Sequence, residues 1–353
     1  MINVKQVAAL AGVSTTTVSR SYSDPDRVHP DTLRRVKQAI SQLGYVPFAS
    51  ARGLRVGRTL TVGILVPTLM NELYAKAVDV LEERLNHQGF NVLLTCHRNN
   101  AETEMKCARA LLGRQVEALV MIGAQHHPEL IPLIHRQNIP YVLMWAIDPT
   151  GSHSVVGYDN RLAMRHLTEH LIELGHRHFA VLPGPLGLQD ILQQRLDGIK
   201  DALVSAGISL HGDQVLPTDY TTSSIRNATR TLLRGNAAPT ALMCSNDLVA
   251  AAAIAECHAL NISVPNNVSV TGFGDWQLAE LITPTLTTVK SNPVYIGETT
   301  ATLLASKISG MAGAKLAQSQ FEAQMVFRDS TAAAPMKSIP QPSSSANPVS
   351  NVR

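Results

Sequence analysis

The stretch "AGVSTTTVSR" at residues 11–20 places a glycine, a serine and three consecutive threonines side by side. Before it, Asn3 followed by Gln6 has the spacing of a capping box, so we predict that a helix begins there. Gly12 suits the left-handed residue that ends this helix, and Ser14 suits the N-cap of a second helix. Two short helices joined by a tight turn that contains glycine are typical of a helix-turn-helix.

The three threonines stand at the N-terminal end of the second predicted helix, although Thr is a mediocre helix former. In a DNA-bound helix-turn-helix this end faces base edges in the major groove. A Thr hydroxyl can donate or accept a hydrogen bond there, and the Thr methyl can pack against the methyl of thymine. We therefore predict DNA contacts from Thr15, Thr16, Thr17 and Arg20. The alternative is a capped surface helix that binds nothing.

Residues 28–47 predict a third helix, with Pro30 in its first turn and Gly44 at its end. Residues 1–58 carry nine Lys and Arg side chains against three Asp, a net charge of +6, whereas the whole chain has +3. Positive charge concentrated in one small segment indicates a nucleic-acid-binding module attached to a nearly neutral body.

The rest of the chain alternates apolar strands with amphipathic helices. A first unit begins with predicted strands at 59–68 and 90–96 around a helix at 74–89, and a second begins with a strand at 178–184 and a helix at 190–207. This alternation is typical of doubly wound parallel sheets with helices on both faces. Two such units predict an α/β body of two subdomains, with a ligand cleft where the strand ends face each other.

Composition restricts the remaining possibilities. The chain of 353 residues is 45% apolar and 16% charged, as expected for two or three domains with a large core. It has no apolar run long enough to span a membrane and no secretory leader pattern, so we expect a cytoplasmic protein. Its four cysteines lack metal-ligand spacing, and His126 and His127 lack a matching third ligand, so neither a metal nor a cofactor is expected. The common nucleotide-binding and hydrolase motifs are missing, so no enzyme is expected.

The run "VKQVAALAGVSTTTVSR…GYVPFASARGL" resembles the LacI/GalR family of bacterial transcriptional regulators, and the resemblance extends to about residue 330. It implies a DNA-binding domain at 1–47, a hinge helix at 48–59 and an effector-binding, dimerising body at 60–330 that is similar to periplasmic sugar-binding proteins. In the hinge, the resemblance implies DNA contacts from Arg52, Leu54 and Arg55, with the leucine inserted into the minor groove.

The resemblance also implies how the chain is divided within the body. The first subdomain comprises 60–160 and 291–319, and the second comprises 161–290 and 320–330. Residues 331–353 are rich in Pro, Ser and Asn and are expected to form a disordered tail. A homodimer that binds a palindromic operator is expected, because the symmetry of the protein and of the DNA then match.

Polar or aromatic residues that follow strand ends are the candidate effector ligands. They are Asn71, Tyr74, Trp145, Arg195, Tyr220, Asn246 and Asp275. Arg195 lies in an "Arg-x-x-Gly" motif that matches the family's effector-binding arginine, and Asn246, Asp275 and Tyr74 match other ligand-contacting positions. A guanidinium offers paired donors to hydroxyls or a carboxylate, and an aromatic ring packs on the C–H face of a sugar.

Two departures from the family pattern bear on the effector. Trp145 stands where many members have Asp, and Gly274 stands where many have a second acidic residue beside Asp275. Acceptors for sugar hydroxyls are thereby lost while Arg195 remains, which favours a sugar acid. In the head, His29 replaces the usual Ser cap, so that helix start is expected to be weaker. The sequence thus predicts a repressor of carbohydrate or sugar-acid genes. A soluble sugar-binding protein without DNA function is the alternative.

Overall fold

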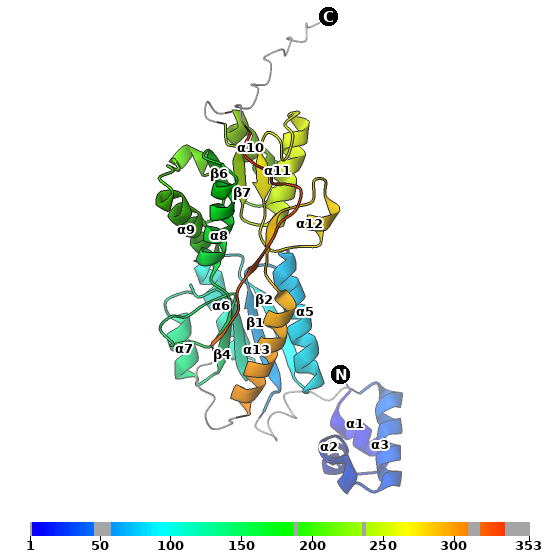
Figure 1. Ribbon diagram of the computed structural model, residues 1–353. Coiled ribbons are helices and arrows are strands. Elements are labelled where there is room, and N and C mark those ends of the chain that lie inside the picture. The colour runs from blue at the N-terminus through cyan, green and yellow to red at the C-terminus, as the bar shows by residue number, and fades with distance from the viewer. Residues whose placement is uncertain (1, 46–57, 187–189, 235–237, 310–317, 336–353) are drawn as a thin grey trace, which may run out of the picture. The chain divides into compact units, whose positions relative to one another are not determined.

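The computed structural model describes residues 2–45, 58–186, 190–234, 238–309 and 318–335 (Figure 1). The predictions for the hinge, including those for Arg52, Leu54 and Arg55, lie outside these residues. The chain divides into two compact units. One contains residues 1–61 with 115–117, and the other contains the remainder.

The first unit contains the predicted helix-turn-helix. Its helices are α1 (Val4–Ala11), α2 (Thr15–Ser23) and α3 (Pro30–Leu43), with a 3-10 turn at Pro25–Arg27. The expected capping box of Asn3 and Gln6 is present, and Gly12 adopts a φ of 63°. Apolar residues of all three helices form the core, namely Val7, Ala8, Ala11, Val18, Val36 and Ala39. The all-α head is therefore confirmed, and its turns form for the predicted reasons.

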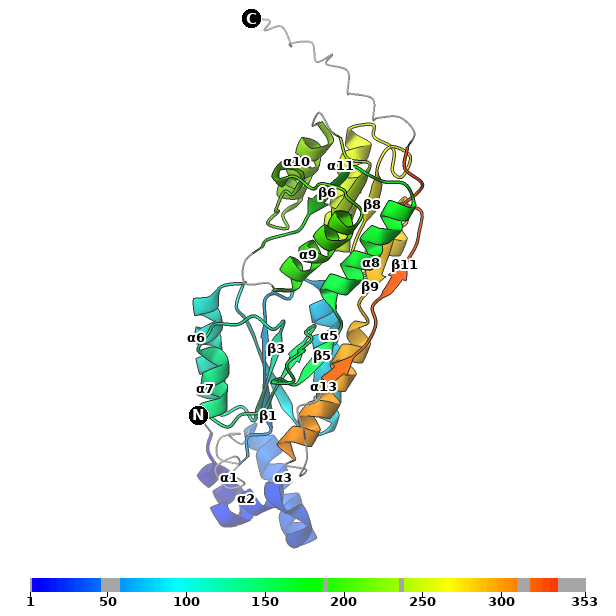
Figure 2. The same ribbon diagram turned by 60° about the vertical axis from the view of Figure 1, so that its left-hand side comes forward.

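The first subdomain of the body is a six-stranded sheet in the order β10-β5-β4-β3-β1-β2. The strands are β1 (Thr61–Val66), β2 (Asn91–Cys96), β3 (Ala118–Ile122), β4 (Tyr141–Met144), β5 (Val155–Gly157) and β10 (Gln318–Gln320). Helices α5 (Glu72–His87) and α13 (Pro293–Ile308) pack against each other on one face. Helices α6 (Ala101–Leu112) and α7 (Leu130–Arg136) lie on the other face (Figure 2).

The second subdomain contains a parallel sheet of β6 (Phe179–Leu182), β7 (Ala241–Cys244) and β8 (Ser269–Thr271). Its helices are α8 (Asn160–Glu173), α9 (Asp190–Ser205), α10 (Thr222–Arg234), α11 (Asp247–Ala259) and α12 (Leu278–Leu281). Helices α8 and α9 approach closely at Gly198, where a Cβ would collide with the backbone of Arg161. These two sheets confirm the predicted α/β body.

A short ribbon of β9 (Thr288–Lys290) and β11 (Gln324–Val326) runs alongside the second sheet. The apolar run "TLTTVK" at 285–290 continues the strand–helix alternation of the sequence and so predicts a further strand of the parallel sheet, but β9 instead pairs antiparallel with β11. Only single parallel bridges, such as Thr271 with Thr287, join this segment to the strand β8 region. The pairing is antiparallel because β9 leads out of the second subdomain toward α13, whereas β11 leads back into it after β10.

The body continues past residue 330, where the tail is predicted to begin. The carbonyl of Ala332 accepts a hydrogen bond from His176 at 3.1 Å, and the Ala334 N–H donates to the Leu174 carbonyl at 2.8 Å. The predicted boundary at 331 is therefore too early, because the buried imidazole of His176 anchors this segment.

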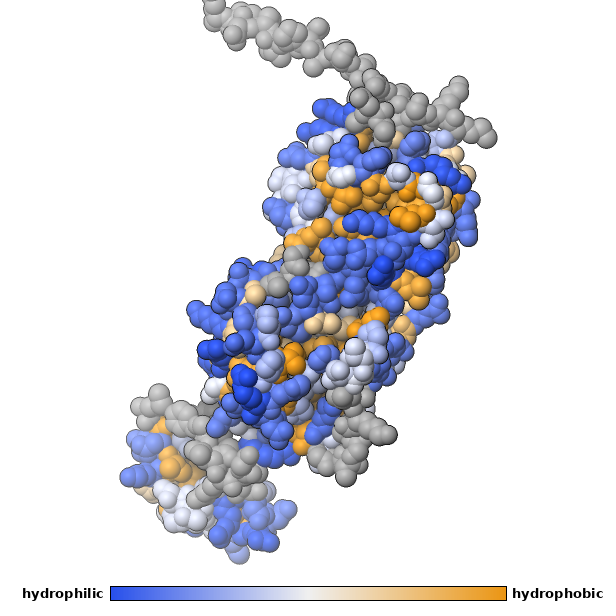
Figure 3. Space-filling view, turned by 90° about the vertical axis from the view of Figure 1, so that its left-hand side faces the viewer, coloured by the Kyte–Doolittle hydropathy of each residue, from blue (hydrophilic) through white to orange (hydrophobic). Residues whose placement is uncertain are grey.

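The side of the body that carries α6, α7 and α9 is covered mainly by hydrophilic residues, with hydrophobic patches between them (Figure 3). In the part of the chain that the structure describes, no helix is long and apolar enough to cross a membrane.

Candidate functional site

The N-terminal end of α2 presents the predicted DNA-contacting side chains. Thr15, Thr16 and Arg20 are exposed, whereas Val18 between them is buried in the core of the head. Ser14 caps the helix by accepting the Thr17 N–H at 3.1 Å, and its hydroxyl lies 2.9 Å from the Thr17 hydroxyl. The structure thus leaves the first two threonine hydroxyls exposed and engages the third in the cap.

Helix α3 adds exposed positive charge to the head. Arg34, Arg35 and Lys37 are all exposed, and the first of them pairs with Asp31 at 2.8 Å. The cap of this helix is weak, as predicted, because His29 Nδ1 accepts the Asp31 N–H at a long 3.4 Å. These side chains suit contacts with phosphates, which depend on charge more than on exact geometry.

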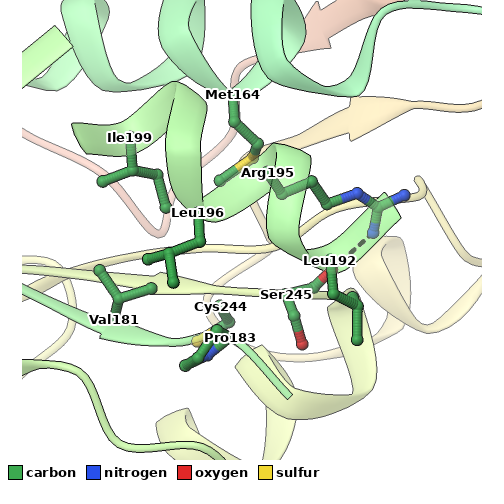
Figure 4. Close-up of a pocket in the computed structure, with 9 residues that line it drawn as sticks. All are labelled: Met164, Val181, Pro183, Leu192, Arg195, Leu196, Ile199, Cys244 and Ser245. Atoms are coloured by element: carbon green, nitrogen blue, oxygen red, sulfur yellow. Dashed lines mark hydrogen bonds between the residues drawn. The ribbon is translucent and has the colours of Figure 1, made fainter. Parts of the chain in front are cut away.

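In the body, the side chain of Arg195 on α9 is buried (Figure 4). Its neighbours come from α8 and from the segments that follow β7 and β8. Its Nε donates to Asn160 Oδ1 at 3.0 Å, and its Nη1 donates to the carbonyl of Ser245 at 2.8 Å. The guanidinium carbon lies 3.5 Å from the centre of the Phe273 ring. Stacking on an aromatic face and two hydrogen bonds fix the plane of the guanidinium.

Aromatic side chains of the first subdomain form the adjoining wall. The rings of Tyr74 and Trp145 meet edge to face with centroids 4.9 Å apart. The indole Nε1 of Trp145 donates to Ser291 Oγ at 2.9 Å, and the Tyr158 hydroxyl lies 2.7 Å from the same oxygen. Burial raises the pKa of Tyr74 and Tyr158, while the nearby charge of Arg195 lowers it. Both phenols therefore remain neutral beside the guanidinium.

Tyr220 joins the same group of residues from the second subdomain. Burial raises the pKa of its hydroxyl, whereas the charge of Arg195 and the nearby side chains of Ser245 and Asn246 lower it. Asn246 also caps α11 by accepting the Val249 N–H at 2.9 Å. The structure thus brings this tyrosine and this asparagine to the predicted side of the cleft, where the asparagine already has a structural role.

Asn71, at the start of α5, is likewise both a candidate ligand residue and a helix cap. Its Oδ1 accepts the Leu73 N–H at 3.0 Å and so caps the helix that carries Tyr74. A side-chain oxygen used in this way has less capacity left for a ligand.

Asp275 is held by a partner within the protein. Its Oδ1 accepts from Arg328 Nη2 at 2.7 Å, and the same nitrogen lies 3.0 Å from Glu280. The neighbouring Asp247 is fully buried and accepts from Thr288 Oγ1 at 2.5 Å, and burial raises the pKa of Asp247 to about 6. Asp275 is thus paired with Arg328, whereas the burial of Asp247 disfavours its charged form.

A small cavity adjoins Arg195 inside the second subdomain. Its volume of about 10 Å³ is room for one water molecule (Figure 4). It is lined by Met164, Val181, Pro183, Leu192, Arg195, Leu196, Ile199, Cys244 and Ser245. Within the described ranges, no group of three or more His, Cys, Asp or Glu side chains is arranged to hold a metal ion.

The sequence places Asn160 among the polar residues at strand ends, but it did not single out Tyr158, Phe273, Ser245 or Ser291 as members of this site. Tyr158 lies two residues before Asn160 in "SVVGYDN", and Ser245 precedes Asn246 in "CSND". Their position at strand ends was a usable signal. Nothing in the sequence indicated that Phe273 and Ser291 would contact the arginine and the tryptophan.

Comparison with known sequence families gives two matches. The model of bacterial regulatory proteins of the lacI family matches residues 3–47, and the model of the periplasmic binding protein-like domain matches residues 168–331. The HTH-type transcriptional repressor PurR of Aliivibrio fischeri is 30% identical over 313 residues, which are 87% of this chain and 92% of PurR.

Solved structures resemble the chain over nearly its whole length. The transcriptional regulator CelR in complex with cellobiose has a TM-score of 0.69 at 30% identity, covering 94% of this chain and 100% of CelR. The Lac repressor dimer bound to operator and the anti-inducer ONPF has a TM-score of 0.80 at 26% identity, covering 94% of this chain and 99% of that chain. The similarity therefore includes both the helix-turn-helix and the α/β body.

Proposed function

Because the chain belongs to the lacI family of bacterial regulatory proteins, whose members include DNA-binding repressors, we propose that it represses sugar-acid genes from a palindromic operator as a homodimer. The head supports the first part of this proposal. Thr15 and Thr16 project from the N-terminal end of α2, the end that enters the major groove in helix-turn-helix proteins, and Arg20 is exposed in the last turn of the same helix. The similar Lac repressor structure is a dimer bound to operator.

Residues 48–59 complete the DNA-binding part in this proposal. Leu54 enters the minor groove as an apolar wedge, and Arg52 and Arg55 contact the backbone beside it. The body at 60–330, extended by the segment that His176 anchors, then binds the effector and carries the dimer contacts. We place the crossings between its subdomains near residues 160, 290 and 320.

Exposed apolar side chains support the homodimer. Met70 is 87% exposed and Leu281 is 74% exposed, and Leu69 and Leu248 are also exposed. They come from the loop before α5 and from α11 and α12, which lie on one side of the body in Figure 1. Exposed apolar side chains are typical of protein–protein contacts, and a two-fold dimer would bury the same ones on both copies.

The observation that carries the effector class is the pairing of Arg195. Its guanidinium donates to the neutral oxygens of Asn160 and Ser245, and Asp275 is occupied by Arg328. No carboxylate of the described residues lies within 4.0 Å of the Arg195 guanidinium. A buried charge without a counter-ion is costly, so a carboxylate on the ligand stabilises this site more than a neutral hydroxyl does. We therefore infer that the effector is a sugar acid.

The proposal is tested by fluorescence anisotropy of operator DNA, selected first from a randomised pool with the full chain. Salt-dependent binding to one selected palindrome is expected, together with a shift in affinity on addition of gluconate but not of glucose. A chain that binds no selected sequence above its non-specific level would instead be the sugar-binding protein without DNA function.

A further inference from the structure

One hydrogen bond joins the two subdomains at the edge of the cleft. The N–H of Ala124, just after β3 in the first subdomain, donates to Asp190 Oδ2 at 2.9 Å. Asp190 is the first residue of α9 in the second subdomain, and the same oxygen lies 3.3 Å from Gln194 Nε2 within that helix. The carboxylate therefore accepts from both sides and bridges elements that lie far apart in the sequence.

The turn that receives this carboxylate has no room for a side chain. Gly123 adopts a φ of +80°, and a Cβ at this position would lie 2.5 Å from Asp190 Oδ1. Glycine is thus favoured here twice, by its backbone conformation and by the close approach of the carboxylate.

A buried pair holds the same turn from behind. His126 Nδ1 lies 2.8 Å from Glu104 Oε1, and its Nε2 lies 3.2 Å from the carbonyl of Gly123. The second oxygen of Glu104 accepts the N–H of His127 at 2.7 Å. The side chains of Glu104 and His126 are each only 3% exposed. Contacts within the first subdomain alone therefore hold the Gly123 turn in place.

From these contacts we propose that Asp190 is a positioning residue, whose carboxylate docks on the Gly123–Ala124 turn and holds the effector cleft closed. We call these three residues the latch. The role rests on the proposed function, because a cleft whose closure is favoured binds its ligand more tightly. A hydrogen bond to a carboxylate displaces a two-state equilibrium by about tenfold or more. The Gln277 N–H also reaches Glu72 across the cleft, at 3.2 Å.

The chain contains its own reporters of closure. It has two tryptophans, and both are buried at the cleft, Trp145 at 1% and Trp276 at 5% exposure. Trp276 lies beside Gly274, which also approaches Leu73 of the first subdomain. Opening the cleft exposes both indoles, so quenching of tryptophan fluorescence by acrylamide measures closure without any ligand or DNA.

The test compares quenching in the full-length wild type with Asp190→Ala, Asp190→Asn and Asp197→Ala. Asp197 serves as the matched control because it is a half-buried residue of the same helix whose carboxylate accepts from Gln193, within that helix, at 2.8 Å. We expect a higher quenching constant for Asp190→Ala and an intermediate one for Asp190→Asn, which keeps an acceptor oxygen. The control should match the wild type. Equal quenching of Asp190→Ala and wild type, with both folded by circular dichroism, overturns the latch.

Gly123→Ala provides a second route if Asp190→Ala does not fold. It should raise quenching by keeping the carboxylate away from the turn, and combining it with Asp190→Asn should add little, because both act on one contact. Wild-type quenching in Gly123→Ala would also contradict the latch. A failure of the proposed function is separate, since it shows as absent operator binding or an absent gluconate response while the quenching differences persist.

Discussion

The guanidinium of Arg195 lies 3.5 Å from the centre of the Phe273 ring, although the two residues belong to different elements of the second subdomain. The ring covers one face of the cation, and Asn160 and the Ser245 carbonyl take two of its N–H groups. The Tyr158 hydroxyl is a further neighbour of the guanidinium, and in the proposed function the remaining N–H groups bind the ligand. This arrangement gives the site a fixed positive charge with a defined plane.

Replacing Arg195 is expected to remove the effector response and to leave operator binding without effector intact, because the head is untouched. Arg195→Ala loses the charge, and Arg195→Lys should also fail, since a point charge cannot reproduce a planar fork. Anisotropy titrations of operator with and without gluconate measure the response, for which a coupling of about 1–3 kcal/mol is typical. Arg161→Ala is the control, because this exposed arginine pairs with Asp201 on the surface. A normal gluconate response in Arg195→Ala would contradict the assignment.

Thr16 is expected to read a base edge, because its side chain is exposed at the end of α2. Thr16→Ala should change the base preferred at one operator position, at a cost of roughly 1–3 kcal/mol for the lost contact. Selection from a randomised site, followed by sequencing, measures the preference. Arg55→Ala serves as a comparison and should weaken all sequences evenly and lower the salt slope. An unchanged preference in Thr16→Ala would mean that the threonine does not read the base.

Leu54 is expected to kink operator DNA, because an apolar wedge unstacks a base step in the minor groove. Leu54→Ala should bind the operator more weakly and bend it less, whereas Leu54→Met should retain most of the bend. Gel phasing with bent reference sequences measures the angle. The hinge assignment fails if wild type and Leu54→Ala bend the DNA equally.

His176 is expected to make stability depend on pH. Burial is the main cause that lowers its pKa from the ordinary 6.5, so the unfolded chain binds the proton more readily than the folded one. Its contribution is therefore fully present above pH 6.5 and is lost as the pH falls through the lower folded value. Urea unfolding at pH 7.5 and at pH 5.5 should show a smaller acid loss in His176→Gln than in wild type. The exposed His178→Gln should behave as wild type, and an identical acid loss in all three would contradict the prediction.

Local chemistry made the head predictable from the sequence. The caps at Asn3 and Ser14 and the glycine at position 12 act within a few residues, so their effect can be read directly. Buried strands such as β1 and β3 were equally clear, because their apolar runs are continuous. The antiparallel pairing of β9 was not predictable, since its partner lies beyond α13 in the chain.

The site was only half predictable for the same reason. The strand-end rule located Arg195, Trp145 and Tyr74, but not what they touch. The partner of Trp145 is Ser291, 146 residues away, and no local pattern marks such a pair. For Asp275 the sequence predicts a ligand contact, because its position matches a ligand-contacting residue of the family. In the structure its carboxylate is already paired with Arg328. Long-range packing therefore decides which candidates remain free for an effector.

Isothermal titration calorimetry of the full-length protein with gluconate and with glucose tests the central claim, that Arg195 selects a carboxylate. We predict that gluconate binds to the wild type, that binding is lost in Arg195→Ala and Arg195→Lys, and that glucose does not bind. Binding of glucose alone, or gluconate binding that survives both substitutions, would contradict the account.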